Sequence, residues 1–194
     1  MWYTHFEVRQ MLETITDIDF YILDFLQVMA RSSFWDGFFA YYTNLGNAVM
    51  VICYCALLLC FRQTRKDGIM VSCGALSGVL ICNLILKNII QRSRPCWLRP
   101  EVQLLIPSPK DYSFPSGHAA SVTILTVILV HNHPRLAIGL IPAALLMVYS
   151  RMYLYVHFPS DVLAGMIIGG AIGLLVCFLS PKVEEKWKKK HSIS

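Results

Sequence analysis

The stretch IMVSCGALSGVLICNLILKNII, from Ile69 to Ile90, decides the fold of this protein. Its one charged side chain, Lys87, stands near the end of an otherwise uncharged run. Because a hydrocarbon core of about 30 Å needs roughly 20 apolar residues per helix, the stretch predicts a membrane-spanning helix. Small residues at Gly74, Ser77 and Gly78 predict close packing of this helix against a neighbour.

The same apolar character extends over the whole chain of 194 residues. Hydrophobic residues make up 56% of it and charged residues only 15%, and the mean hydropathy is +0.53, which excludes an ordinary soluble domain. We therefore predict one all-α domain over residues 1–194, a polytopic membrane bundle of five to six transmembrane helices. Further spans are predicted at residues 44–61, 116–130, 136–150 and 160–179.

Positive charge sets the predicted orientation. The net charge of +5 is concentrated at residues 62–66 and in the tail of residues 181–194, with no broad basic surface for nucleic acid. When the spans alternate, these segments and Arg135 fall on one side, which we predict to be cytoplasmic. The proline-rich stretch of residues 91–115 is then a loop on the extracytoplasmic side of the plasma membrane.

The N-terminal region admits two structures. Acidic residues interrupt an apolar stretch from Ile18 to Phe39, which either spans the bilayer or lies at its surface. Asp24 in mid-span would need a partner inside the bundle, so an interfacial helix around Ile15 to Met29 is favoured.

Strong polar groups gather at the predicted helix ends on the extracytoplasmic side. Ionisable groups at membrane depth are costly, so their default explanation is function. The gathered residues are Lys87, Arg92, Arg94, Ser116, His118, Arg151, His157 and Asp161.

Lys87 and Arg94 are seven residues apart. On one helix they would share a face, about 10.5 Å apart along the axis, and Pro95 would end that helix. Both side chains would then reach one anion, although two cations at the membrane surface need no ligand.

Ser116 is a good N-cap for the helix that follows it. The free N–H groups of the first turn and the helix dipole bind phosphate, and Gly117 removes the side chain that would block the approach. His118 would lie beside the anion. An ordinary capped helix start is the alternative.

The third cluster holds Arg151, His157 and Asp161. Arg151 is a bidentate phosphate donor. Asp161 can accept a hydrogen bond from one ring nitrogen of His157, which leaves a free lone pair on the other nitrogen, as a nucleophilic histidine requires. A simple ion pair at a helix start is the competing explanation.

The segments KNIIQRSRP, PSGH and SRMYLYVHFPSD resemble the three-part signature of the type 2 phosphatidic acid phosphatase superfamily. The pattern Lys-x6-Arg-Pro, Pro-Ser-Gly-His and Ser-Arg-x5-His-x3-Asp occurs in order, over roughly residues 68–180. The resemblance implies that His157 attacks phosphorus, Asp161 orients it and His118 protonates the leaving oxygen. It also implies catalysis without a metal or cofactor, and a phosphate site formed by Lys87, Arg94, Ser116, Gly117 and Arg151.

The resemblance also suggests a substrate. Small members of the family with an outward-facing site include undecaprenyl diphosphate phosphatases, so we predict hydrolysis of undecaprenyl diphosphate to undecaprenyl phosphate and phosphate. Phosphatidylglycerophosphate, phosphatidic acid and lipid A phosphates are alternative substrates. A head-group phosphotransferase and a non-catalytic lipid-binding membrane protein are the alternatives of a different class.

Arg99 and Lys110, in the loop of residues 91–115, are predicted contacts for a second phosphate. His133 stands in the short link HNHPR, where we expect it to be solvated.

Overall fold

The computed structural model describes residues 2–191, with side chains described for residues 13–181. Every regular element in that part of the chain is helical, which confirms the predicted all-α class. In chain order the elements are α1 (Trp2–Ala30), α2 (Ser33–Tyr42), η1 (Thr43–Gly46), α3 (Ala48–Cys60), α4 (Arg65–Gly78), η2 (Val79–Leu86), α5 (Lys87–Ile90), α6 (Pro95–Leu98), α7 (Gly117–Asn132), η3 (Pro134–Leu136), α8 (Ala137–Tyr153) and α9 (Pro159–His191).

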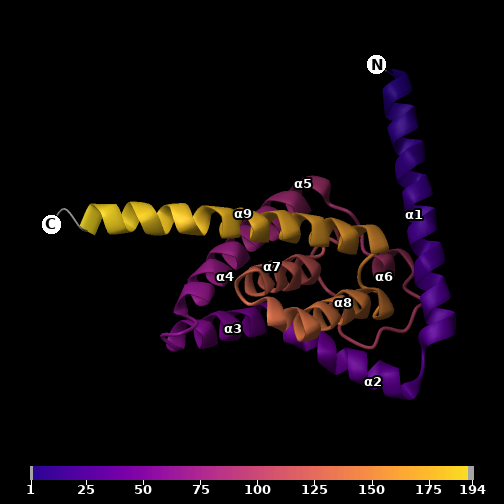
Figure 1. Cartoon of the computed structure of the whole chain (residues 1–194). Coiled ribbons are helices and arrows are strands. Elements are labelled where there is room, and N and C mark those ends of the chain that lie inside the picture. Colours follow the sequence, from indigo (N-terminus) through magenta and orange to yellow (C-terminus); the bar gives the residue numbers. More distant parts are fainter. Residues whose placement is uncertain (1, 192–194) are drawn as a thin grey trace.

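Helix α7 lies at the centre of the bundle, where it contacts α4, α8 and α9 (Figure 1). Its Ile124 and Ile128 are fully buried. They form a core with Met70 and Val71 of α4 and Ile172 of α9. The start of α7, which carries the predicted phosphate-binding turn, is therefore held by a helix surrounded on several sides.

Small residues permit this packing. A Cβ atom on Gly74 would lie 2.6 Å from the Ile124 side chain, and one on Gly78 would lie 2.8 Å from it, which confirms the predicted close packing of this span. On α9, a Cβ on Gly165 would lie 2.5 Å from the carbonyl oxygen of Ser116. Helix α9 thus lies close to the backbone of α7 at Ser116, where α7 begins.

The span predicted from Ile69 to Ile90 is confirmed as a helix, and it begins earlier, at Arg65. It continues through a wider π-helical segment, η2, into α5. Gln91 then adopts a left-handed backbone conformation with φ of 50°, which ends the helix.

The predicted count of five to six transmembrane helices is not confirmed. Three helical segments in the described chain are long and apolar enough to span, at Arg65–Leu98, Pro134–Tyr153 and Pro159–Pro181. A fourth is possible if Ser33–Gly46 and Ala48–Cys60, bent by 55°, form one span. Helix α7 is apolar but has 16 residues, about 24 Å at 1.5 Å per residue, which is shorter than the hydrocarbon core.

Helix α1 runs across the direction of α9 in Figure 1. Within the described residues, α1 is not among the helices that are long and apolar enough to span a membrane. It packs against α8 and α9. The favoured helical structure at Ile15 to Met29 is confirmed, as part of a longer element; its place at the membrane surface stays a prediction. At the other end of the chain, α9 continues into the predicted basic tail as far as His191, and residues 192–194 lie outside the described residues.

Candidate active site

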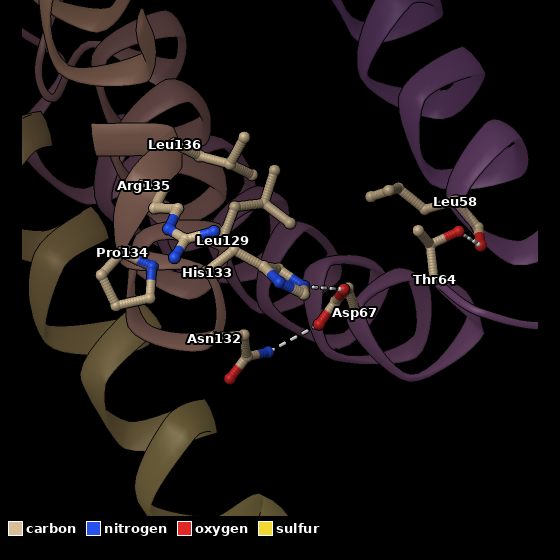
Figure 2. Close-up of a pocket in the computed structure, with 9 residues that line it drawn as sticks. All are labelled: Leu58, Thr64, Asp67, Leu129, Asn132, His133, Pro134, Arg135 and Leu136. Atoms are coloured by element: carbon tan, nitrogen blue, oxygen red, sulfur yellow. Dashed lines mark hydrogen bonds and ion pairs between the residues drawn. The ribbon is translucent and has the colours of Figure 1, made fainter. Parts of the chain in front are cut away.

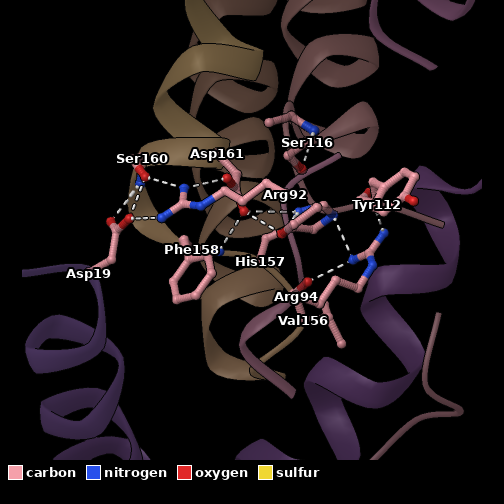
Figure 3. A network of polar contacts seen from close by, with 12 residues as sticks. Asp19, Arg92, Arg94, Tyr112, Ser116, Val156, His157, Phe158, Ser160 and Asp161 are labelled. Carbon is pink, nitrogen blue, oxygen red and sulfur yellow. Dashed lines mark hydrogen bonds and ion pairs between the residues drawn. The ribbon is translucent and has the colours of Figure 1, made fainter. Parts of the chain in front are cut away.

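His157 lies in the link between α8 and α9 and is fully buried. Its Nε2 atom is 3.2 Å from Nη1 of Arg94 (Figure 3). Because a guanidinium only donates hydrogen bonds, Nε2 must be the accepting nitrogen, and the proton of the neutral ring is on Nδ1. The lone pair of Nε2 therefore points toward the predicted phosphate-binding cations.

The carboxylate of Asp161 does not contact His157 as directly as predicted. Its Oδ2 atom is 3.6 Å from Nδ1 of His157, too far for a hydrogen bond. The hydroxyl of Ser113 lies 3.4 Å from the same nitrogen and donates to Asp161. Asp161 is also fixed by the backbone N–H of Phe158 at 2.9 Å. Ser113 therefore shares the position next to the histidine ring.

Burial lowers the pKa of His157 well below its ordinary value, and the positive charges of Arg94, Arg151 and Lys87 lower it further. The negative charge of Asp111 acts in the opposite direction but does not outweigh them. His157 is thus held in its neutral form, with a lone pair available at neutral pH.

Lys87 and Arg94, the two cations of the segment KNIIQRSRP, lie close together, but not in the way that their spacing predicted. Lys87 is in α5, but Arg94 lies beyond the end of that helix in an extended conformation, so the two residues do not share a helix face. Pro95 accounts for this, because the residue before a proline is disfavoured in the helical region. Both cations instead bind the carboxylate of Asp111, which is 2.8 Å from Nη2 of Arg94.

Arg94 makes several further contacts. Its Nε atom donates to the carbonyl of Asp111 at 2.7 Å, and its Nη1 atom donates to the carbonyl of Val156 at 2.6 Å. The guanidinium is thus fixed between the loop before α7 and the link that carries His157. Burial by itself would raise the pKa of Asp111, but Lys87 and Arg94 hold it at about 2.

This lowered pKa has a measurable effect on stability. Because the folded-state pKa of about 2 lies below the ordinary 3.8, ionised Asp111 stabilises the fold above about pH 4, and this contribution is lost as the pH falls toward 2. We expect Asp111→Asn to unfold at a lower temperature than the wild type at pH 6, with the difference shrinking on acidification. Glu101→Gln, at an exposed carboxylate of the same loop, is the control. A difference in unfolding temperature that does not depend on pH would contradict this assignment.

Arg151 is buried at the end of α8 and donates a hydrogen bond to Thr43 of η1. Its Nε atom is buried and has no hydrogen-bond partner in the described part of the chain. Arg151 and His118 line the same cavity of about 550 Å³. Segment η1 also packs closely against His118, because a Cβ atom on Gly46 would lie 2.8 Å from the His118 ring.

Ser116 caps α7 as predicted. Its side chain accepts a hydrogen bond from the N–H of Ala119 at 3.5 Å, and its own N–H donates to the carbonyl of Asp161 at 3.0 Å. The second bond ties the start of α7 to the start of α9. A Cβ on Gly117 would lie 2.8 Å from the amide oxygen of Asn83, so the absence of a side chain is needed here to accommodate η2.

The structure therefore brings the predicted site residues to one end of the bundle, and it adds residues that local patterns did not indicate. Ser113, Asp111 and Thr43 are polar residues of a kind found in any loop or turn, so their spacing held no signal. The sequence places Arg92 among the polar groups at this end of the bundle, but its spacing does not indicate its partners.

Arg99 does not face the site as predicted. Its guanidinium is 2.5 Å from the carboxylate of Asp24, lies over the Phe20 ring at 3.9 Å and contacts the hydroxyl of Tyr155 at 3.4 Å. The reason is that α1 supplies a carboxylate and an aromatic face beside the loop. Lys110 is exposed.

His133 is exposed, as predicted, and its Nε2 atom also lies 2.7 Å from the carboxylate of Asp67. Asn132 donates to the same carboxylate at 2.7 Å. These residues line a second cavity of about 540 Å³ between the start of α4 and the end of α7 (Figure 2). That cavity is at the opposite end of α7 from Ser116, so it is separate from the candidate active site.

The apolar bundle, with its cluster of cations and histidines at one end, is that of an integral membrane protein. The sequence profile of the PAP2 superfamily matches residues 68–184. The chain belongs to this superfamily, and it is a multi-pass membrane lipid phosphatase.

Relatives of known function have different substrates in their names. The chain is 35% identical over 151 residues to undecaprenyl-diphosphatase of Sulfolobus acidocaldarius. The aligned residues make up 77% of this chain and 70% of that protein. It is 29% identical over 187 residues to lipid A 4'-phosphatase of Bacteroides thetaiotaomicron, with coverage of 89% and 81%.

Solved structures share the fold. A transmembrane PAP2-type phosphatidylglycerolphosphate phosphatase from Bacillus subtilis matches with a TM-score of 0.72 at 26% identity, over 88% of both chains. LpxE from Aquifex aeolicus matches with a TM-score of 0.73 at 27% identity, over 81% of this chain and 93% of that one.

Proposed function

We propose that this enzyme hydrolyses a lipid-linked phosphate or diphosphate through a phosphohistidine intermediate on His157. One observation carries the proposal: the buried, neutral His157 directs its Nε2 lone pair toward a group of buried cations. A neutral imidazole among cations is suited to attack an anionic phosphate, because the cations stabilise the negative charge on the phosphoryl oxygens.

In the first step, Nε2 of His157 attacks the terminal phosphorus while the bond from that phosphorus to the oxygen of the leaving group breaks; in a lipid diphosphate this is the bridging oxygen, and the lipid phosphate leaves. His118 gives its proton to that leaving oxygen, and Ser113 and Asp161 stabilise the charge that develops on the ring through Nδ1. In the second step, His118 accepts a proton from water, the water oxygen attacks phosphorus, and inorganic phosphate leaves. His157 then returns to its neutral form.

The phosphate is held by the side chains of the motif residues together with the first turn of α7. Gly117 supplies a backbone N–H group at the positive end of the α7 dipole, and Ser116 supplies its hydroxyl, because the N–H of Ser116 is already bonded to the carbonyl of Asp161. The cations balance the charge of the transferred group without requiring a metal ion. The cationic side chains of this cradle are Lys87, Arg94 and Arg151.

We infer that undecaprenyl diphosphate is the substrate, with the active site on the extracytoplasmic side and the C-terminus in the cytoplasm. The similarity to undecaprenyl-diphosphatase supports this choice. The cavity beside His118 adds a physical argument, because its wall has the polar residues Thr43, Asn44, Asn47 and Arg151 on one part and the apolar residues Leu105 and Ile106 on another. Such a mixed wall accommodates the remaining phosphate of a diphosphate together with the start of its hydrocarbon chain.

The test is phosphate release by the purified full-length protein in detergent, with EDTA present. Undecaprenyl diphosphate, phosphatidylglycerophosphate, phosphatidic acid and a lipid A phosphate are compared at equal concentration. We expect the highest kcat/KM for undecaprenyl diphosphate, without inhibition by EDTA. Preference for one of the other lipids would reassign the substrate, and release from none of them would contradict the proposed function.

A further inference from the structure

Helix α1 buries a carboxylate, Asp19, beside the link that carries His157. Asp19 is 2% exposed. It accepts hydrogen bonds from both the backbone N–H of Ser160, at 2.9 Å, and the Ser160 hydroxyl. A buried carboxylate is costly unless it is paired, so this arrangement calls for a compensating charge. Asp19 also lies outside residues 68–184, the part of the chain matched by the family.

The compensating charge is Arg92, which bridges two carboxylates (Figure 3). Its Nη2 atom is 2.7 Å from Asp19, and its Nη1 atom is 2.6 Å from Asp161. The guanidinium also lies over the ring of Phe158, 4.1 Å from its centroid. The side chains thus form a continuous path of alternating charge, from Asp19 through Arg92 to Asp161 beside His157.

The path affects the charge that Asp161 presents to the histidine. Paired with Arg92 alone, Asp161 would be neutralised, and only Asp111 would then act as a negative charge on the phosphorylated ring. Asp19 shares the charge of Arg92, so the three groups together carry one negative charge. Because the side chains of His157 and Asp161 are both buried and lie less than 4 Å apart, that residual charge acts strongly on the ring.

We propose that Asp19 of helix α1 is a positioning residue for the reaction, acting through Arg92 on Asp161 and His157. The proposal rests on the proposed function of His157 as the nucleophile. It makes the N-terminal helix part of the catalytic apparatus, although none of its residues needs to contact the substrate.

Helix α1 also provides a matched control. Asp24 is one and a half turns further along and contacts the same link, accepting a hydrogen bond from the hydroxyl of Tyr155 at 2.9 Å. It also pairs with Arg99, but its side chain is 46% exposed and it is not connected to Asp161 by any described contact. Asp24→Asn therefore weakens the attachment of α1 without altering the charge path.

The experiment compares Asp19→Asn and Asp24→Asn as full-length proteins in detergent, with kcat, KM and the pH dependence of kcat/KM measured for each. We expect Asp19→Asn to lower kcat about 10- to 100-fold with little change in KM. Loss of a negative charge disfavours protonated His157, so the acid limb of kcat/KM should move to lower pH. Asp24→Asn should stay within about twofold of the wild type in all three quantities.

The outcomes separate the alternatives. A folded Asp19→Asn protein with unchanged kcat and acid limb would overturn the proposal, as would an equal loss in Asp24→Asn. If Asp19→Asn does not fold, Ser160→Ala decides, since it removes one hydroxyl from the path and no charge. It should lower kcat about fivefold at constant KM, and an unchanged kcat would overturn the proposal. Absence of His157-dependent turnover in the wild type would instead refute the proposed function.

Discussion

Replacing His157 with alanine is expected to lower kcat/KM for lipid phosphate hydrolysis by about 10⁴-fold or more, because it removes the side chain that carries the phosphoryl group in the proposed reaction. The buried ring lies between the loop before α7 and the link to α9, so the cavity left by the substitution also has a structural cost. The measurement is phosphate release under single-turnover and steady-state conditions, with the unfolding temperature recorded alongside. A folded His157→Ala protein that retains wild-type turnover would remove the nucleophile from the mechanism.

Trapping the phosphohistidine intermediate distinguishes loss of the catalytic step from loss of the folded structure. In the proposed reaction His118 activates the water that releases phosphate, so the His118→Ala protein should retain the phosphoryl group on His157. The experiment uses a substrate with a labelled phosphate whose leaving group needs no protonation, because the variant also lacks the acid of the first step. The bond should be acid-labile and alkali-stable, as expected of phosphohistidine. The double variant His118→Ala/His157→Ala is the matched control and should take up no label.

The second large effect is expected at Gly165 of α9. A Cβ there would lie 2.5 Å from the carbonyl oxygen of Ser116 and 3.0 Å from Cβ of Ala119, so Gly165→Ala forces α7 and α9 apart. Overpacking against a backbone atom should lower the free energy of unfolding by about 3 kcal/mol. Because the displaced carbonyl belongs to the turn proposed to bind phosphate, activity should fall about 100-fold in the protein that remains folded.

Gly170 is the control for this prediction, since it is on the same helix and a Cβ there would lie 3.9 Å from the nearest described atom, in Thr123. Gly170→Ala should change the free energy of unfolding by no more than about 0.5 kcal/mol and leave turnover unaltered. The comparison uses thermal unfolding in detergent and phosphate release. Equal stability of the two variants would show that α7 and α9 can separate without cost.

The three motifs could be recognised from the sequence because each belongs to one local segment. Ser116 caps α7 as its position before Gly117 predicted. The inferred relation of Lys87 to Arg94 was wrong, because it assumed that a helix continues to Pro95 and the backbone turns at Gln91 instead. The predicted contact of Asp161 with His157 was only approximately correct, because Ser113 occupies part of the space between them.

The sequence by itself determined the membrane class, the positions of the long apolar helices and the residues of the three motifs. These features depend on hydrophobic run length, capping residues and fixed spacing, which act over a few helical turns. Only the tertiary structure decided that Asp19, Thr43 and Asp111 contact the motif residues. Such contacts join segments far apart in the chain, and they form where helix packing brings two polar groups within hydrogen-bond distance, which no local pattern of residues encodes.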